Sequence, residues 1–191
     1  MRANLAGLSD QELVLRVQGA RDRHAFAELV RRHQAPLQAF LRRLTGGGEA
    51  EDLAQDVFIR CHDRIATFRG DAQFRTWLFA IAYREFLRWK RRTLLYGRLL
   101  HYLSGPAENA ALDPDDALSL QSALNGLSVP ERAAILLCDA CGLSHGEAAQ
   151  ALSVPLGSLK TYVQRARGKM RQAMDGNAEL EQGLVSCETT S

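Results

Sequence analysis

Polar and basic side chains gather on one side of residues 156–171, directly after a chain break at Pro155. The apolar residues there recur at steps of three and four, and they are Leu156, Leu159, Val163, Ala166 and Met170. This spacing predicts a helix with one buried stripe. The polar residues that then face outward are Lys160, Thr161, Gln164 and Arg165. Such groups can hydrogen-bond base edges and neutralise phosphates, so the chemistry predicted for this face is DNA binding.

A second, shorter helix is predicted immediately before it. Ser144 and Glu147 form a capping box, which starts a helix. Pro155 ends that helix, because it lacks a backbone N–H and disfavours α geometry at Val154. Two helices joined by a short turn, the second with an outward polar face, indicate a helix-turn-helix. A packed helical hairpin with an ordinary solvated basic face is the alternative for these residues taken alone.

Aromatic and basic residues occur together between residues 66 and 92. The basic stripe of this stretch and the aromatic residues beside it are Arg84, Arg88, Arg91 and Arg92, with Tyr83, Phe86 and Trp89. Aromatic planes next to a cationic track suit single-stranded DNA, because unpaired bases stack while the backbone follows the charge. Most of these aromatic side chains are nevertheless expected in the core, since a small helical domain has few other large side chains to pack.

An acidic helix is predicted at 49–65. Its core residues recur every four positions and are Leu53, Val57, Cys61 and Ile65. This pattern leaves a polar face outside, formed by Asp52, Gln55, Asp56, Arg60 and Asp63. By themselves these residues predict an ordinary solvated face.

Helical periodicity runs through nearly the whole chain and strand signals are almost absent, so the predicted fold class is all-α. Besides the segments above, helices are expected at 9–19, 23–45 and 94–103. We expect the last of these to close the first of two small helical domains.

The domain boundaries follow from composition. Residues 104–116 combine prolines, a glycine and acidic residues, which predicts a flexible acidic linker. The two small helical domains are therefore expected at 1–103 and 117–175. A polar, acidic tail follows at 176–191.

The charge distribution separates two basic bodies. The formal net charge is only +2, but residues 1–92 carry 17 Lys or Arg against 11 Asp or Glu. The linker and the tail are acidic, so the small total hides basic domains suited to nucleic acid. No apolar run approaches the roughly 20 residues that cross a bilayer, and the N-terminus does not have the features of a signal peptide. A cytoplasmic protein without direct membrane insertion is expected.

The cysteines and histidines offer little for catalysis. Cys138 and Cys141 form a C-x-x-C within an apolar helical run, without a second ligand pair at zinc spacing. Five scattered histidines and the lack of a Gly-rich phosphate loop give no convergent catalytic set. We expect no enzyme activity, no metal, no cofactor and no small-molecule substrate.

Three stretches together resemble bacterial sigma factors. Residues 143–167, with Glu147-Ala148-Ala149, Pro155-Leu156-Gly157-Ser158 and Arg165-Ala166-Arg167, resemble region 4. The sequence AEDLAQDVF at 50–58 resembles region 2.2, and residues 66–92 resemble regions 2.3 and 2.4. In this order, over about 10–103 and 115–173, the chain is similar to the extracytoplasmic-function (ECF) group. The resemblance implies a region 2 helical bundle and a region 4 helix-turn-helix.

The resemblance also implies roles for individual residues. For the minus-35 element it implies DNA contacts by Ser158, Lys160, Thr161, Gln164, Arg165 and Arg167. For the minus-10 element it implies Phe68, Arg69, Asp71, Tyr83, Arg84, Arg88, Lys90 and Arg91. For docking to core RNA polymerase it implies Asp52, Gln55, Asp56 and Arg60. The implied partners are the clamp helices of the β′ subunit, the flap of the β subunit, promoter DNA and an anti-sigma factor, often membrane-anchored.

One departure from the family concerns the minus-10 region. After the Ile-Ala pair of region 2.3 the family often has asparagine and, four residues on, aspartate. Here Ile81-Ala82 is followed by Tyr83-Arg84 and then Arg88. Arginine cannot imitate the paired donor and acceptor of an amide, so the preferred minus-10 bases stay open.

A conventional operator-binding regulator is the alternative function. It would use the same helix-turn-helix, but it usually needs a dimer to read two half-sites. It would also leave residues 49–92 unexplained. Binding to core polymerase separates the two hypotheses.

Overall fold

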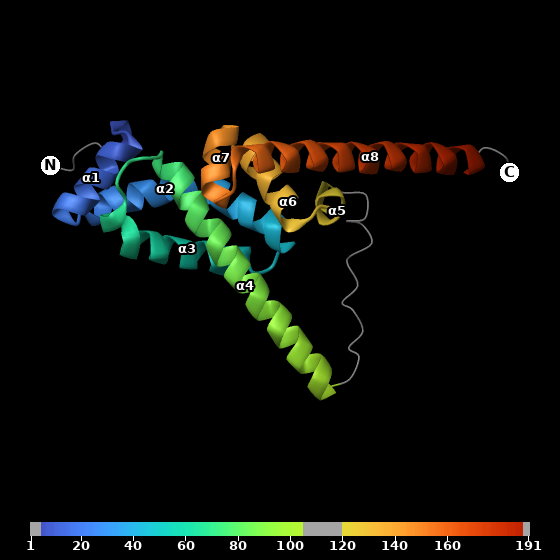
Figure 1. The fold of residues 1–191 in the computed structure, drawn as a ribbon, viewed down its shortest axis with the longest axis horizontal. Helices are drawn as coiled ribbons and strands as arrows, with labels where there is room; N and C mark the ends of the chain where they lie inside the picture. The colour runs from blue at the N-terminus through green and yellow to red at the C-terminus, as the bar shows by residue number, and fades with distance from the viewer. Residues whose placement is uncertain (1–4, 105–119, 189–191) are drawn as a thin grey trace.

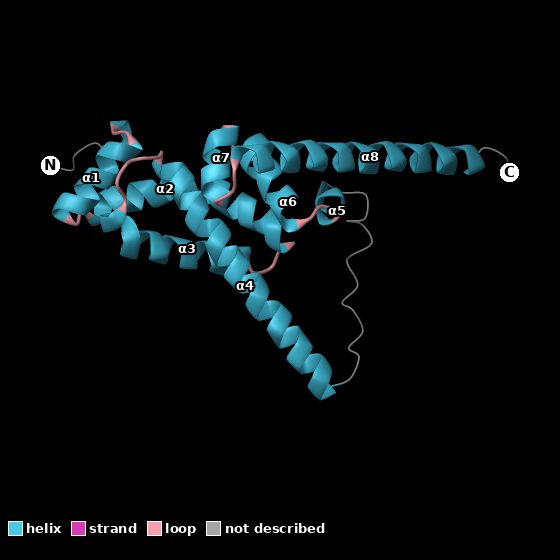
Figure 2. Cartoon of the chain, in the orientation of Figure 1, coloured by secondary structure: helices cyan, strands magenta, loops and turns pink. Residues whose placement is uncertain are grey.

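The computed structural model describes residues 5–104 and 120–188, with side chains for 5–96 and 120–174. Within these ranges the chain is built from helices and turns and contains no strand (Figure 2). The all-α prediction is therefore confirmed, while most of the predicted linker lies outside the described residues. No helix in the described part is long and apolar enough to cross a membrane.

The first body is formed by four helices. They are α1 (Asp10–Ala20), α2 (Arg23–Thr45), α3 (Ala50–Arg64) and α4 (Phe74–Ser104) (Figure 1). Local sequence sets the boundaries. Ser9 and Glu12 close a capping box on α1, and Asp22 accepts hydrogen bonds from two backbone N–H groups at the start of α2. Gly46, at a φ of 86°, ends α2 in the left-handed conformation that glycine adopts without strain.

The core of this body confirms the predicted helical spacing. Its largest fully buried side chains are Leu13, Leu29, Leu37, Phe40, Leu41, Val57, Leu78, Phe79 and Phe86. Phe40 of α2 and Phe79 of α4 meet edge to face, with ring centroids 5.2 Å apart. Such aromatic contacts add to the free energy of apolar burial.

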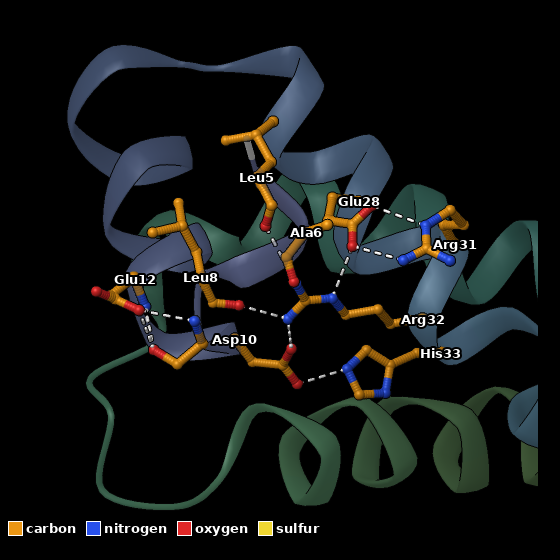
Figure 3. A network of polar contacts seen from close by, with 10 residues as sticks. Leu5, Ala6, Leu8, Asp10, Glu12, Glu28, Arg31, Arg32 and His33 are labelled. Atoms are coloured by element: carbon orange, nitrogen blue, oxygen red, sulfur yellow. Dashed lines mark hydrogen bonds and ion pairs between the residues drawn. The ribbon is translucent and has the colours of Figure 1, made fainter. Parts of the chain in front are cut away.

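A polar network fastens the N-terminal residues to α2 (Figure 3). Arg32 donates to the backbone oxygens of Leu5, Ala6 and Leu8, and it forms ion pairs with Glu28 at 2.8 Å and with Asp10 at 3.0 Å. His33 Nε2 lies 2.6 Å from the other carboxylate oxygen of Asp10. The His33 hydrogen bond is the main cause that lowers the pKa of Asp10.

Helix α4 differs from the prediction at its C-terminal end. A separate helix at 94–103 was expected to close the first domain, but α4 runs unbroken to Ser104 and projects away from the body (Figure 1). Leu94, Leu95 and Tyr96 are 59–66% exposed, so they do not pack on it. The predicted closing helix is therefore wrong. An apolar sequence does not show whether its helix face packs against another element.

The second body contains α5 (Leu120–Asn125), α6 (Val129–Ile135), α7 (His145–Leu152) and α8 (Leu156–Glu188). The capping box predicted at Ser144 is present, and Ser128 forms a second one with Glu131 at the start of α6. A π-helical turn, Leu136–Ala140, follows α6 within the apolar run that contains the C-x-x-C. Helix α8 continues through most of the residues that composition marks as a polar tail.

One apolar expectation in this body is wrong. Leu156 was expected in the buried stripe of α8, but it is 45% exposed. The rest of the α8 stripe is correct, since Leu159, Val163 and Ala166 are buried and Met170 is partly buried. Leu156 is the first residue of its helix and lies beyond the reach of the core.

The two bodies pack against each other through α7 and α4. Arg75 donates to the backbone oxygen of Gly142 at 3.1 Å, and Arg132 donates to that of Leu44 at 3.4 Å. Gln121 reaches the oxygen of Arg43 at 3.4 Å. Leu44 and Arg43 belong to the last turn of α2, whose carbonyls lack partners within their own helix and attract positive charge.

Candidate nucleic-acid interface

The turn between α7 and α8 has a geometry that fixes both helices. Ser153 ends α7 in the left-handed region, at a φ of 56°. Its N–H donates to the Gln150 oxygen at 3.1 Å, and the N–H of Val154 donates to the Ala149 oxygen at 3.0 Å. Pro155 then precedes α8, and its oxygen accepts from the N–H of Leu159. The helix-turn-helix predicted from Ser144 and Pro155 is therefore present.

The outward face of α8 carries most of the predicted minus-35 residues. Lys160, Gln164 and Arg165 are exposed and make no side-chain hydrogen bond or ion pair with a described residue. Thr161 is also exposed, but its hydroxyl donates to the Gly157 oxygen at 3.0 Å. Ser158 is half-buried. Three extended polar side chains are therefore available to a ligand on this face.

Arg167 is exposed yet already engaged. Its guanidinium forms a two-pronged pair with Asp139, at 3.1 Å and 2.7 Å, and Asp139 raises its pKa. Further along α8, Lys169 pairs with the buried Glu131 at 2.7 Å. These two pairs tie α8 to the helices beneath it. A phosphate that binds Arg167 must compete with Asp139.

The loop before α4 holds the first predicted minus-10 residues. Gln18 Nε2 donates to the oxygens of Ile65 and Phe68, each at 2.8 Å, and so fixes the loop on α1. Phe68 is half-buried beside Trp77, with ring centroids 5.1 Å apart. Arg69 and Asp71 are exposed.

A hollow opens beside this loop. It has a volume of about 480 Å³ and is lined by the Phe68–Phe74 loop together with the first turn of α1. Its polar walls include Ser9, Asp10, Asp71 and Gln73. That volume lies in the range of small-ligand sites.

The predicted minus-10 residues on α4 separate into exposed and covered ones. Arg84, Arg88 and Arg91 are exposed and Lys90 is half-buried. Arg84 Nε donates to the Ala80 oxygen at 2.9 Å, so its side chain lies along the helix. Tyr83 is only 9% exposed. Burial raises its pKa, and Tyr162 of α8 contributes to the same shift. In this arrangement the second body covers Tyr83, and a base cannot stack on it.

The predicted docking residues share one face of α3. Asp52, Gln55, Asp56 and Arg60 are all exposed. The residues behind them, Leu53, Val57 and Cys61, are buried as predicted. Asp52 also stands in the first turn of α3, where a negative charge favours the helix dipole.

The sequence analysis did not single out Glu85, a buried acidic residue between α3 and α4. Glu85 of α4 has a side chain that is 8% exposed and pairs with Arg60 of α3 at 2.9 Å and with Arg88 at 2.8 Å. The three-residue spacing of Glu85 and Arg88 could have indicated one of these pairs. The ion pair with Arg60 joins two helices, and no residue spacing in the sequence indicates it.

Three cysteines have described side chains, Cys61, Cys138 and Cys141, and burial raises the pKa of each. Burial raises the pKa of Cys61 to about 12 and that of Cys141 to about 11, which keeps the thiols protonated. No group of His, Cys, Asp or Glu that could hold a metal ion lies among the described residues.

The fold and these surfaces define a two-body helical protein with a helix-turn-helix and a second set of exposed basic residues on α4. Comparison with protein families identifies both bodies. Residues 29–108 match the model for Sigma-70 region 2, and residues 117–170 match that for Sigma-70, region 4.

Similar proteins cover nearly the whole chain. ECF RNA polymerase sigma factor SigM of Mycobacterium tuberculosis is 33% identical over 168 residues, which are 87% of this chain and 85% of that protein. The ECF RNA polymerase sigma-E factor of Escherichia coli is 32% identical over 179 residues, covering 84% and 91%. The chain belongs to the ECF group of RNA polymerase sigma factors.

Two solved structures share the fold. CnrH, solved in complex with the cytosolic domain of CnrY, matches with a TM-score of 0.65 and 25% identity over 87% of this chain and 97% of its own. RpoE of Bartonella quintana, solved with the anti-sigma factor NepR, matches with a TM-score of 0.65 and 29% identity over 78% and 96%.

Proposed function

We propose that this protein binds RNA polymerase core and directs it to promoters, with a separate surface for each task. The face of α3 formed by Asp52, Gln55 and Asp56 docks on core. The loop at Phe68–Asp71 and the exposed arginines of α4 engage the minus-10 element. The outward face of α8 reads the minus-35 duplex. Its role is that of a transcription initiation factor and not of an enzyme.

The observation that carries this proposal is the outward face of α8. Lys160, Gln164 and Arg165 extend from one helix that follows a helix-turn-helix turn, and the described residues leave them unpaired. A helix with free amide and guanidinium groups fits the major groove, where arginine pairs best with guanine and glutamine with adenine. If this face had only a structural role, we would expect its basic residues to pair with acidic residues of the same chain, as Lys169 does with Glu131.

The minus-10 assignment rests on the hollow beside Phe68. An unstacked base needs an aromatic neighbour and polar groups for its edge, and Phe68, Asp71 and Gln73 supply both there. Arg84, Arg88 and Arg91 provide cationic groups along α4 for the strand that follows. We place this action in the cytoplasm, where bacterial RNA polymerase meets the chromosome.

An inhibitory partner is part of the proposal. The solved relative from Bartonella quintana is bound to an anti-sigma factor. We propose that an anti-sigma factor likewise controls this chain, by covering surfaces that polymerase needs.

Run-off transcription with purified core polymerase on a library of genomic promoters tests the function. We expect transcripts that start at defined sites and share two upstream sequence elements. Mobility-shift assays without core should show weak promoter binding. Tight binding of one palindromic operator by the protein alone, without core-dependent transcripts, would instead establish the conventional regulator.

A further inference from the structure

The carboxylate of Glu85 lies between the docking helix and the promoter-facing helix. Its Oε2 is 2.9 Å from Nε of Arg60 on α3, and its Oε1 is 2.8 Å from Nη1 of Arg88 on α4. Each oxygen therefore binds a different guanidinium. The Glu85 side chain is 8% exposed, whereas those of Arg60 and Arg88 are 44% and 50% exposed.

Because the Glu85 side chain is buried, its two ion pairs restrict the positions of both arginines. A buried carboxylate is unfavourable unless its oxygens are paired, so Glu85 holds both arginines in place. Arg88 is an exposed cation of α4, like Arg84 and Arg91, and its ion pair with Glu85 restricts the direction of its side chain. Charge-assisted hydrogen bonds are the stronger ones in proteins, and they fix geometry as well as adding energy.

We propose that Glu85 is a positioning residue for promoter recognition and that Arg60 acts through it. Arg60 then serves the minus-10 contact of Arg88, although it shares a helix face with Asp52 and Asp56. The inference rests on the proposed function. It assigns Arg60 to DNA discrimination and leaves core docking to the acidic residues of α3.

The physical reason is preorganisation. An arginine held by a buried acid presents its remaining N–H groups in a fixed direction, which suits a particular base edge or phosphate. Without the ion pair to Glu85, the Arg88 side chain can turn toward any nearby phosphate. Loss of Glu85 should therefore raise indiscriminate DNA binding while it lowers the preference for the correct minus-10 sequence.

The experiment uses holoenzyme assembled from full-length chain and core polymerase, on the promoter found by run-off transcription and on the same promoter with a scrambled minus-10 element. Glu85→Gln keeps the size of the side chain and removes its charge. We expect the ratio of the two initiation rates to fall on the order of tenfold, as for the loss of one directed base contact. The slope of the logarithm of the binding constant against the logarithm of the salt concentration should become steeper by about one. The reason is that Arg88 becomes free to bind a phosphate and to displace its counterion.

Arg60→Ala should reproduce the loss of discrimination with unchanged affinity for core, and Arg60→Lys should restore part of it. Arg64→Ala is the matched control, since it removes the same charge from the exposed face of α3 next to Arg60 without an ion pair to Glu85. Circular dichroism and a melting curve for each variant check that the fold is intact.

Two results would overturn the inference. One is an Arg60→Ala protein that loses affinity for core and keeps full discrimination. The other is a Glu85→Gln protein with native stability and an unchanged ratio. If the unmodified chain does not initiate with core at all, the proposed function fails, and that result is distinct from either.

Discussion

At the residue scale, the polar side chains of this protein divide into those that hold the structure and those left for a partner. Arg32, Arg167 and Lys169 all pair with acids of their own chain. Lys160 and Arg165 do not pair with a described residue. A basic residue without an internal partner has its full charge available for a phosphate or a base edge. The division identifies Arg165 as a better candidate for DNA contact than Arg167.

Arg165→Ala should weaken binding of the holoenzyme to its promoter by about 1–3 kcal/mol and relax discrimination in the minus-35 element. Competition binding on promoters with single substitutions measures both effects. Arg171→Ala, six residues further along α8, removes the same charge and should weaken binding to all sequences alike. An equal loss for Arg165→Ala on scrambled DNA would show that this residue reads no base.

Asp10 makes the stability of the first body depend on pH. Its pKa in the folded protein is lowered from 3.8, first by the hydrogen bond with His33. The unfolded chain therefore binds more protons than the folded one as the pH falls past that value. The stabilisation is complete well above pH 3.8 and is lost as the pH falls through the folded-state pKa.

Urea denaturation between pH 3 and pH 7 measures this linkage, at roughly 1.4 kcal/mol for each unit of pKa difference. Asp10→Asn should flatten the acid limb of the curve and lower stability at neutral pH. Glu51→Gln removes an exposed charge from the first turn of α3 and should leave the slope nearly unchanged. Parallel slopes for Asp10→Asn and the unmodified protein would contradict the linkage.

At the scale of elements, α3 shows how one helix can serve two purposes. Its buried stripe of Leu53, Val57 and Cys61 belongs to the core, and its outer face is free for a partner. Because the core and the proposed docking face lie on opposite sides of α3, we expect that the docking face can be altered without loss of the fold. A charge change in the first turn should alter helix stability by only about 0.3–1 kcal/mol.

Reversal of both Asp52 and Asp56 to Lys should abolish binding to core polymerase while the far-UV helix signal is retained. Pull-down with immobilised core measures the first effect and circular dichroism the second. The neutral pair Asp52→Asn with Asp56→Asn should bind with intermediate affinity, since it removes attraction without adding repulsion. Undiminished capture of the reversed protein would exclude this face as the docking site.

At the scale of the whole molecule, the described structure is a closed form. α7 packs on α4, so the proposed minus-10 and minus-35 surfaces belong to two bodies that are in contact. Minus-10 and minus-35 elements lie roughly 25 base pairs apart, which is on the order of 85 Å of duplex at about 3.4 Å per base pair. We therefore expect the two bodies to separate when both elements are bound.

The contact between the bodies is suited to opening. The Nε atoms of Arg75 and Arg132 are buried there without a hydrogen-bond partner among the described residues. A buried donor without a partner is unfavourable, and it becomes hydrated when the contact opens, so these groups oppose closure. Modest interactions with a large partner can therefore shift the equilibrium.

Energy transfer between dyes at the exposed positions 63 on α3 and 171 on α8 follows this change. We expect high efficiency for the free chain and a clear drop when core polymerase is added. Arg75→Ala removes the hydrogen bond to Gly142 and should lower the efficiency before core is present. Constant efficiency with core that initiates normally would show that the bodies stay together.

The sequence alone determined the all-α fold class, the starts of the capped helices and the buried stripe of most of α8. These features follow from neighbours within about four positions, through caps at Ser9 and Ser144, the break at Pro155 and the apolar stripe of α8. The tertiary structure alone decided the exposure of Leu94 and Leu156, the burial of Tyr83 and the pairing of Glu85 with Arg60. Those features depend on contacts between segments that lie far apart in the chain. The local sequence around an apolar or charged residue does not show whether another segment packs against it.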